Sequence, residues 1–456
     1  MSQIRFYLTL FIVKSVIRFM KLLGFNATDT PGRIALILCP DIIGRIKLPN
    51  TVLAVTGTNG KTSTNNILSQ VLRNSGYSVI DNAFGGNINS GIASCLIQHC
   101  DLKGVCDYDF ACLEIDERSA GKIFPYLTPD YLICTNLQRD SMMRNANVEF
   151  IFSILDKYLP ASTRLILNGD ELNCCQLGKG RNKSRTFFRV DLQKDEVCRD
   201  NIIKDVTVCL ECGSDIRWDF VRNHAIGQGH CVNCDFGSPE CKYIMRRRED
   251  NKLFIETEGI VKQYPLVGFR IVDYYNQTAV VSLLKEVGLT DEVISAGLEN
   301  TIIPKSRFEE FNINGKKIIS ILSKGMNAIA VSSSFDVIEK DKTKKSVLLF
   351  LDDARDAVKS SELISWIYDV DYEFLNDENI RQIIIGGKRS IDHKVRMLMA
   401  DIEAEKISTS INVLNMVEHL DVKEIETIYL LFDVYNVPEY KRVSEKVKQL
   451  CQREVA

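Results

Sequence analysis

The stretch TVLAVTGTNGKTSTNN, residues 51–66, decides how the chain folds. Residues 51–55 are apolar or β-branched, a composition that predicts a buried strand. A turn containing Gly57 and Gly60 follows, and residues 66–72 then continue with the apolar spacing of a helix. A strand, a tight turn and a helix in this order form the setting in which phosphate-binding loops occur. The sequence therefore predicts a phosphate-binding loop between the strand and the helix.

The predicted loop supplies the residue types that bind a nucleotide and its metal ion. Glycines let backbone N–H groups approach phosphate oxygens closely, and the helix N-terminus adds further donors. In such a loop Lys61 would reach the β- and γ-phosphates, and the hydroxyl of Thr62 would bind Mg²⁺. The candidate nucleotide-binding residues of the loop are Gly57, Thr58, Asn59, Gly60, Lys61, Thr62 and Ser63.

One position of the loop departs from the standard motif. That motif has a glycine five residues before Gly60, where this chain has Val55. A glycine turn that opens an ordinary αβ unit therefore remains an alternative. The shortened form GTNGKT resembles the loop of Mur ligases and folylpolyglutamate synthetases, which are ATP-dependent amide-forming enzymes. This resemblance implies that the chain uses ATP and Mg²⁺.

Length and composition narrow the class of protein. The chain has 456 residues, which suggests two or three domains, and its apolar content of 45% is sufficient for a full core. A net charge of −3 gives no support for nucleic-acid binding as the main task. Fifteen cysteines in a chain of this length do not form the framework of a small secreted protein. Because the sequence has no signal peptide with a cleavage site, we expect a reducing, cytoplasmic location.

The amino-terminal residues 4–23 are rich in apolar side chains, but basic residues interrupt them. The longest uncharged run, residues 6–13, is too short to span a bilayer. Lys14, Arg18 and Lys21 recur at the spacing of one face of an amphipathic helix. We expect this helix to pack on the first domain. A helix lying on the inner face of the membrane is the alternative, so membrane contact is peripheral at most.

Strand-like and helical segments alternate beyond the loop. This alternation predicts a parallel sheet with helices on both faces. Ligands bind such sheets at the carboxyl ends of the strands, which would bring the loop, Glu114 and Asn136 to one edge. The predicted strands after the first are residues 77–81, 110–115, 131–135 and 164–167.

Glu114 ends its predicted strand in the run LEIDE, residues 113–117. A carboxylate at a strand end beside a phosphate loop can bind Mg²⁺. The alternative is a solvated charge at a strand terminus. Because Lys61 and Thr62 are expected nearby, we assign Glu114 to the magnesium site.

Four cysteines in two pairs predict a zinc site. Cys209-x-x-Cys212 and Cys231-x-x-Cys234 are separated by 18 residues, the spacing of a four-cysteine zinc ribbon. Four thiolates complete a tetrahedral shell, so this Zn²⁺ would be structural. Unligated thiols and a nucleic-acid-binding ribbon are the alternatives. His224 and His230 could compete as ligands, but the four cysteines already complete the set.

A second α/β domain is predicted after a boundary near residues 302–307. Strand-like segments recur there at residues 316–322, 346–351, 383–385 and 427–431. Asp352, Asp353 and Asp356 follow a strongly apolar strand, a place where functional carboxylates often lie. A polar loop after a strand explains these residues equally well.

Seven segments of the chain match, in order, those of the MurT family, the Mur-ligase-like subunits of lipid II isoglutaminyl synthase. The resemblance covers nearly the whole chain, and its most specific part is a zinc ribbon inside a Mur central domain. The matching segments are TPGRIA, VTGTNGKTST, GGNINSGI, LEIDE, ICTNLQRD, LILNGDE and IIIGGKR.

The resemblance implies an α/β fold with three parts. Residues 1–45 would form an amino-terminal helix and lead-in. Residues 46–305 would form a Mur-ligase-like central ATP-binding domain with a parallel sheet, interrupted by the zinc ribbon at about 200–262. Residues 306–456 would form a carboxyl-terminal α/β domain of the MurT type.

The resemblance also implies an activity and a partner. Members of the family activate the α-carboxylate of D-glutamate in the lipid II stem peptide with ATP, and ammonia then gives D-isoglutamine. The ammonia comes from a glutamine amidotransferase subunit, GatD, in a heterodimer. This chain fits that division, because none of its cysteines lies in the Gly-x-Cys-x-Gly turn of a glutaminase nucleophile.

Carried over position by position, the resemblance assigns further site residues. Lys61 and Glu114 would be catalytic together with Asp356, which would complete the partner's glutaminase triad. Asn276, Arg307 and Lys324 resemble nucleotide contacts at the domain junction. The four cysteines would hold zinc, and Thr62 and Glu114 would hold magnesium.

Several family motifs are altered in this chain, and two other functions therefore remain open. The Ala-Asp-Gly motif stands here as Arg355-Asp356-Ala357, and the Lys-Asn-Pro turn as Lys324-Gly325-Met326. One alternative is a Mur-type ligase that joins an amino acid to a carboxylate without a partner. The other is a non-catalytic scaffold that kept the fold and the zinc.

Overall fold

The computed structural model describes residues 3–82, 86–139, 147–194, 196, 198, 201–302, 308–323, 325–351, 364–433 and 435–453. The chain divides into two compact units. The first comprises Met1–Gln138, Asn147–Arg199 and Val206–Ile303, and the second comprises Arg139–Ala146, Asp200–Asp205 and Pro304–Ala456.

The first unit is built on a sheet that has nine strands among the described residues, in the order β11-β10-β9-β6-β5-β4-β1-β3-β2. Across this sheet, the seven neighbouring strands β9, β6, β5, β4, β1, β3 and β2 run parallel, as the sequence predicts. Strands β10 and β11 pair antiparallel at one edge. The strands are β1 Thr51–Thr56, β2 Val79–Asp81, β3 Phe110–Glu114, β4 Tyr131–Cys134, β5 Arg164–Asn168, β6 Arg185–Val190, β9 Tyr243–Glu249, β10 Lys252–Thr257 and β11 Ile260–Pro265.

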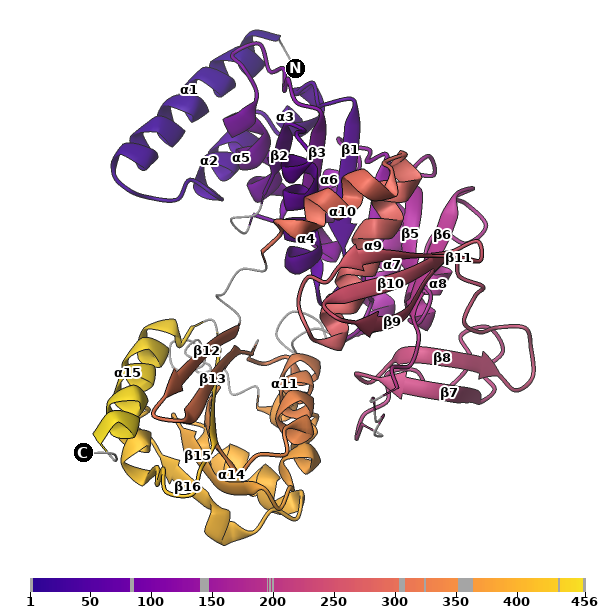
Figure 1. Cartoon of the computed structure of the whole chain (residues 1–456). Helices are drawn as coiled ribbons and strands as arrows, with labels where there is room; N and C mark the ends of the chain where they lie inside the picture. Colours follow the sequence, from indigo (N-terminus) through magenta and orange to yellow (C-terminus); the bar gives the residue numbers. More distant parts are fainter. Residues whose placement is uncertain are drawn as a thin grey trace. The chain divides into compact units, whose positions relative to one another are not determined.

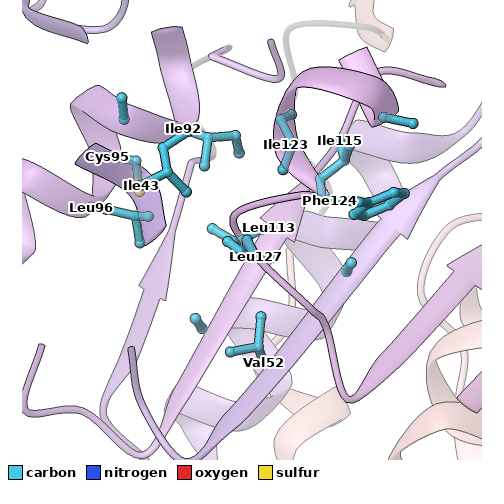
Figure 2. Close-up of a cluster of buried hydrophobic side chains, with 14 of the residues drawn as sticks. Ile43, Val52, Ile92, Cys95, Leu96, Leu113, Ile115, Ile123, Phe124 and Leu127 are labelled. Atoms are coloured by element: carbon cyan, nitrogen blue, oxygen red, sulfur yellow. The ribbon is translucent and has the colours of Figure 1, made fainter. Parts of the chain in front are cut away.

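Helices cover both faces of this sheet because successive strand residues point to opposite sides. In β1, Val52 and Ala54 join the core under α5, whereas Leu53 and Val55 join the core under α4 and α9. Figure 2 shows part of the first core, where Ile92 and Leu96 of α5 lie toward Leu113 of β3. The helices are α4 Lys61–Asn74, α5 Asn89–His99, α6 Ala120–Ile123, α7 Val148–Tyr158, α8 Leu172–Gln176, α9 Ile271–Val287 and α10 Asp291–Glu299, with the 3₁₀ helix η1 Glu117–Ser119.

The amino-terminal segment forms three helices. Helix α1, Gln3–Leu22, packs on α2 and α5 (Figure 1), so the predicted docking of this helix on the first domain is confirmed. The lead-in to β1 forms α2, Thr30–Leu38, and α3, Ile42–Arg45, two helices that the sequence does not predict. Pro31 suits the first turn of α2, because a helix does not use the N–H groups of its first residues. Among the helices in the described part of the chain, none combines the length and hydropathy needed to cross a membrane.

A hairpin stands apart from the main sheet. Strands β7, Ile216–Arg222, and β8, Ile226–Cys231, pair antiparallel (Figure 1). The segment that bears them shares a small core with Leu172 of α8. Strands β9 to β11 fall mostly within the range expected for the insertion, yet they extend the main sheet. The hairpin-bearing segment is therefore shorter than the sequence suggests, because β9 finds its partner in β6, far back in the chain.

The second unit contains a six-stranded sheet, in the order β12-β13-β17-β14-β15-β16, within its described residues. All neighbours run parallel except β12 and β13. The strands are β12 Phe308–Ile313, β13 Lys316–Leu322, β14 Lys345–Phe350, β15 Ile380–Gly386, β16 Ile407–Ser410 and β17 Thr427–Phe432. The helices are α11 Ala328–Lys340, α13 Ser365–Tyr368, α14 Ser390–Met399 and α15 Val437–Arg453, with the 3₁₀ helices η3 Tyr372–Leu375, η4 Ala404–Lys406 and η5 Asn415–His419.

Candidate functional site

The loop between β1 and α4 requires glycine at two positions. Gly57 has φ of 128°, and a Cβ there would lie 2.1 Å from Oγ1 of Thr135. Gly60, the N-cap of α4, has φ of 87°, and a Cβ there would lie 2.6 Å from Oδ1 of Asn276. Both positions combine a left-handed backbone with close packing, which only glycine tolerates. The loop is thus a tightly seated structure at the carboxyl end of β1.

The end of the neighbouring strand β4 fastens this loop. The backbone N–H of Thr58 donates to the carbonyl of Asn136 at 2.8 Å, and that of Asn59 donates to Oδ1 of Asn136 at 2.9 Å. In return, Thr135 and Asn136 both donate from their side chains to the carbonyl of Asn59, at 2.7 and 2.9 Å. The loop is therefore held by the protein itself.

Lys61 begins α4 and points into an acidic pocket. Its Nζ lies 3.0 Å from Oε1 of Glu117 and also contacts the carbonyls of Gly57 and Thr58. Burial lowers the pKa of Lys61, but the carboxylates of Glu117, Glu114 and Asp116 raise it, and the net pKa is above the ordinary value. Lys61 is therefore charged at neutral pH and is surrounded by more negative than positive charge.

Glu114 lies at the end of β3 in this same pocket, at the sheet edge where the sequence places it. It is 4% exposed, and its Oε1 accepts a hydrogen bond from Nδ2 of Asn87 at 2.8 Å. Thr62 and Ser63 follow Lys61 in the first turn of α4. A pocket of carboxylates beside a helix N-terminus suits a divalent cation bound together with an anion, which is the chemistry of magnesium and a nucleotide phosphate.

Asn276 of α9 reaches the loop from the other side. Its Oδ1 accepts a hydrogen bond from Oγ1 of Thr64 at 3.1 Å and packs on Gly60. The residue thus shapes the loop. Of the other predicted site residues, Arg307, Lys324 and Asp356 lie outside the described residues, as do Asp352 and Asp353.

The four predicted zinc ligands lie together. The sulfur atoms of Cys209, Cys212, Cys231 and Cys234 are all within 4.8 Å of one another. The Cys209–Cys234 and Cys212–Cys231 pairs are 3.6 and 3.4 Å apart. A tetrahedral zinc with Zn–S bonds of about 2.3 Å would place its sulfurs roughly 3.8 Å apart, so the cluster has the size that the ion requires. Neither His224 nor His230 belongs to this group among the described residues.

Backbone N–H groups point at two of these sulfurs. The N–H groups of Glu211 and Cys212 donate to Sγ of Cys209 at 3.4 and 3.5 Å, and that of Asn233 donates to Sγ of Cys231 at 3.3 Å. Such donors stabilise thiolate rather than thiol. The donor set, its spacing and these turns therefore all fit a structural Zn²⁺.

The hairpin of the ribbon touches the nucleotide loop through Gln138. Nε2 of Gln138 donates to the carbonyl of Asn223, at the turn between β7 and β8, at 2.8 Å. Oε1 of the same residue accepts from Nδ2 of Asn59 at 3.3 Å, and its backbone exchanges hydrogen bonds of 2.9 and 3.1 Å with Oγ1 of Thr58. One side chain thus joins the zinc-bearing hairpin to the phosphate loop.

A buried network joins the hairpin to the helix that carries Asn276. Arg222 of β7 donates to the hydroxyl of Tyr275 at 2.6 Å and pairs with Glu196. The hydroxyl of Tyr275 donates to Oδ2 of Asp170 at 2.6 Å. Burial raises the pKa of Tyr275. Burial lowers the pKa of Arg222, but its partners, Glu196 among them, raise it further, so Arg222 remains charged.

Three residues that position the loop or Lys61 are not predicted from the sequence. Glu117, rather than Glu114, holds Lys61, although it belongs to the same run LEIDE. Gln138 and Glu171 support the loop from behind, and Oε2 of Glu171 accepts from the N–H of Leu137 at 2.8 Å. The motifs ICTNLQRD and LILNGDE contain Gln138 and Glu171, so the sequence marks these two residues but not the groups to which they hydrogen-bond.

The comparisons with known proteins point to one enzyme family. Residues 55–211 match the Mur ligase middle domain, and residues 324–435 match the MurT ligase C-terminal domain. A relative from Staphylococcus aureus, "Lipid II isoglutaminyl synthase (glutamine-hydrolyzing) subunit MurT", is 27% identical over 83% of this chain and 84% of its own length.

Solved structures agree on the fold. A pseudomurein peptide ligase type C from Methanothermus fervidus superposes with a TM-score of 0.64 at 17% identity, over 90% of this chain and 81% of its own. The MurF ligase from Thermotoga maritima in complex with ADP gives a TM-score of 0.57 at 15% identity, over 93% of this chain and 85% of its own. The chain thus has the predicted Mur-ligase-like α/β fold.

Proposed function

The chain is a divergent member of the MurT family, and on that premise we propose that it is the ATP-dependent subunit of a lipid II isoglutaminyl synthase. Its substrate is the lipid II stem peptide, in which the α-carboxylate of D-glutamate becomes the amide of D-isoglutamine. The observation that carries the proposal is the position of Lys61, a buried ammonium at the mouth of a seated glycine loop and beside three carboxylates.

The proposed reaction has two steps. An oxygen of the substrate carboxylate attacks the γ-phosphorus of ATP, the bond to the β-phosphate oxygen breaks, and an acyl phosphate and ADP result. Ammonia then attacks the acyl carbon, the carbon–oxygen bond to phosphate breaks, phosphate leaves, and the nitrogen loses a proton. The first step develops negative charge on the transferred phosphoryl group, and fixed positive charge stabilises it.

The residues of the site divide this work. Lys61 supplies the positive charge, and the N–H groups at the start of α4 bind the phosphate oxygens. Thr62 and Glu114 would hold Mg²⁺, which lowers the charge repulsion between nucleotide and carboxylate. Glu117 keeps Lys61 in place, and Asn136 and Asn276 hold the loop open for the phosphates.

The ammonia comes from a glutamine amidotransferase partner of the GatD type. The relative from Staphylococcus aureus, named as one subunit of a glutamine-hydrolysing synthase, supports this division of labour. We assign Asp356 to the partner's active site, where a carboxylate orients a catalytic histidine that hydrogen-bonds to it. Asp356→Asn then abolishes glutamine-dependent amidation and leaves ammonium-dependent amidation intact, with Asp352→Asn and Asp353→Asn as matched controls. Equal loss of both activities would place Asp356 at the ATP site instead.

Zinc has a structural role in this proposal. Cys209, Cys212, Cys231 and Cys234 complete its shell, so no position remains open for substrate. The ion keeps the hairpin folded, and the hairpin supports the loop through Gln138.

The activity is tested with purified protein, ATP, Mg²⁺, ammonium chloride and lipid II that has a free α-carboxylate. Mass spectrometry should show the amide, and ADP should form in equal amount, whereas Lys61→Ala protein should form neither. ADP release that depends on an added amino acid and not on ammonium would identify a partner-independent ligase. A protein that neither binds nor hydrolyses ATP would be a scaffold, and the proposal would be wrong.

A further inference from the structure

Helix α1 has one face that the protein buries. Phe6, Leu10, Val13 and Ile17 recur at helical spacing and join the core under α2 and α5. Lys14 also points inward, where its Nζ donates to the carbonyls of Ile97 and Cys100 at the end of α5. This face explains why the helix is docked, and it holds about a third of the apolar side chains of α1.

The opposite face of α1 is apolar as well. Five apolar residues there are four, three, eight and three positions apart, the spacing of a single helical stripe, and their side chains are 57% to 85% exposed. They are Ile4, Leu8, Phe11, Phe19 and Leu22. At 100° per residue, this stripe is centred opposite the buried stripe. A helix packed on the surface of a globular domain normally presents polar side chains there. Fold stability therefore gives no reason for these five residues.

The apolar surface continues past the end of the helix. Leu23 and Phe25 flank Gly24, which has φ of 76° and ends α1, and they are 56% and 61% exposed. Single exposed apolar residues are common in proteins, but seven within 22 residues on one side of a helix and its end, interrupted by Ser15, are typical of a surface that binds something apolar. We call these seven residues the α1 outer face.

The charged side chains of residues 1–28 all have one sign. The first acidic residue of the chain is Asp29, so residues 1–28 contain four basic and no acidic side chains. With Lys14 engaged inside and Arg5 donating to the carbonyl of Leu38, the exposed basic side chains of the helix include Arg18 and Lys21. Long basic side chains beside an apolar stripe can extend to phosphate groups while the stripe enters the acyl region.

We propose that the α1 outer face docks on the surface of an anionic phospholipid bilayer, with the helix lying in the plane of the interface. Phe and Leu side chains with a basic border are the composition of such interfacial helices. Where two proteins bind each other, each partner normally contributes both acidic and basic side chains to the interface. Residues 1–28 contain no acidic side chain. The inference does not depend on the proposed reaction, although a lipid-linked substrate would be presented at the same surface.

The test is flotation of the full-length protein with vesicles of phosphatidylglycerol and phosphatidylcholine, and with vesicles of phosphatidylcholine alone. Wild-type protein should float with the anionic vesicles and less with the neutral ones, and added salt should weaken the binding. A variant combining Leu8→Gln, Phe11→Gln and Phe19→Gln should lose vesicle affinity about tenfold or more, because it removes most of the apolar area that enters the interface.

Matched variants distinguish docking through α1 from nonspecific adsorption of exposed apolar side chains. A variant combining Ile260→Gln, Leu398→Gln and Ile411→Gln also removes three exposed apolar side chains, but elsewhere, and should bind vesicles like wild type. Arg18→Glu with Lys21→Glu should abolish the preference for anionic lipid. Because all these residues are exposed, thermal unfolding should confirm that each variant is folded. Wild-type protein that stays with the unbound fraction, or equal binding by both triple variants, would overturn the proposal, as would dimers that only the α1 variant disrupts.

Discussion

Two lysine–carboxylate pairs among the described residues, one in each unit, differ in a way that separates function from stability. In the first unit, Nζ of Lys61 lies 3.0 Å from Glu117, and the lysine side chain is 13% exposed. In the second unit, Nζ of Lys345 lies 2.7 Å from Asp377, and the lysine side chain is fully buried. Lys61 follows the carboxyl end of β1, whereas Lys345 is the first residue of β14.

Both lysines lie among more than one carboxylate. Lys345 contacts the carboxylate of Asp377 and the carbonyl of Asp341, and its charge also acts on the carboxylate of Asp341. Lys61 lies near Glu114, Asp116 and Glu117, of which Asp116 also pairs with Arg118. Only Lys61 lies at the carboxyl end of a parallel strand, the edge of the sheet where ligands bind. Position in the sheet, more than burial or local charge, therefore distinguishes a site from a structural ion pair.

The largest effects on turnover and stability are expected when each of the two lysines is replaced by alanine. Lys61→Ala should lower ATP-dependent turnover by about 10³-fold or more, because the positive charge acts mainly in the transition state. Lys345→Ala should remove the ion pair with the partly buried Asp377 and cost about 1–3 kcal/mol of folding stability, with turnover unchanged below the unfolding temperature. ADP formation and thermal unfolding, measured on both variants, check the contrast. Normal ATP turnover by Lys61→Ala protein, or wild-type stability of Lys345→Ala protein, would contradict this contrast between the two lysines.

Removal of zinc should have the next largest effect, and mainly on stability. The hairpin has a small core that includes Cys209, Val206 and Phe236, so most of its stability must come from the metal. Metal analysis should give about one zinc per chain. Chelation, or Cys209→Ser, should destabilise the first unit by about 2 kcal/mol or more, which corresponds to roughly 5 °C in melting temperature.

Cys241→Ser provides the matched control for zinc. Burial raises the pKa of Cys241 to about 12, and this thiol lies outside the group of four. The substitution should therefore leave the zinc content at the wild-type value. Purified protein that is free of zinc and equally stable would contradict the assignment of the cluster.

The sequence was sufficient where the signal is local. Residues 51–55 form a continuous apolar run that becomes β1, and the Cys-x-x-Cys pairs determine their own grouping. The helical lead-in had a local signal too, since Asp29, Thr30 and Pro31 are a typical helix start, but the apolar run behind them suggested a path into the strand. Elements of this kind are set by their own residues.

The sequence was not sufficient where the partner is distant. Strands β9 to β11 join the main sheet because β9 pairs with β6, and no pattern within residues 243–265 carries that information. The choice of Glu117 over Glu114 as the partner of Lys61 depends on the turn after β3, where Asp116 caps η1 and reverses the chain. Gln138 and Asn223 are 85 residues apart, and their contact follows from the placement of the whole hairpin.

Gln138 offers a smaller test of how the ribbon affects the nucleotide site. Gln138→Leu removes the hydrogen bonds of its side chain to Asn223 and Asn59 but keeps the backbone bonds to Thr58. Two hydrogen bonds contribute about 1–3 kcal/mol, so KM for ATP should rise about tenfold with kcat less affected. Steady-state kinetics measure this split.

Gln193→Leu is the matched control for Gln138. Gln193 is also a largely buried glutamine near the ribbon, but its Nε2 donates to the carbonyl of Asp191, away from the loop. Its substitution should lower stability without changing KM for ATP. If both variants changed KM equally, the effect would reflect general loosening, and the specific link between ribbon and loop would be lost.

The smallest expected effect concerns pH and the second unit, where His393 is buried beside Tyr372 and Trp366. Burial lowers the pKa of His393 from 6.5 to about 3. Arg396, whose guanidinium lies over the ring of Tyr372, is paired with Glu373. The second unit therefore folds with a neutral histidine.

The sign of the pH effect follows from proton binding. Between pH 6.5 and about 3, the unfolded chain binds a proton at His393 that the folded unit does not bind. Stability from this group is therefore complete above pH 6.5 and falls by about 1.4 kcal/mol for each pH unit below it. His393→Gln removes this slope, whereas His419→Gln, at an exposed position, should keep it. In a Trp218→Phe background, Trp366 is the one tryptophan of the chain, and its fluorescence during urea unfolding at pH 5 and pH 7 reports the second unit. Parallel pH profiles for the two histidine variants would show that His393 does not titrate as a buried neutral group.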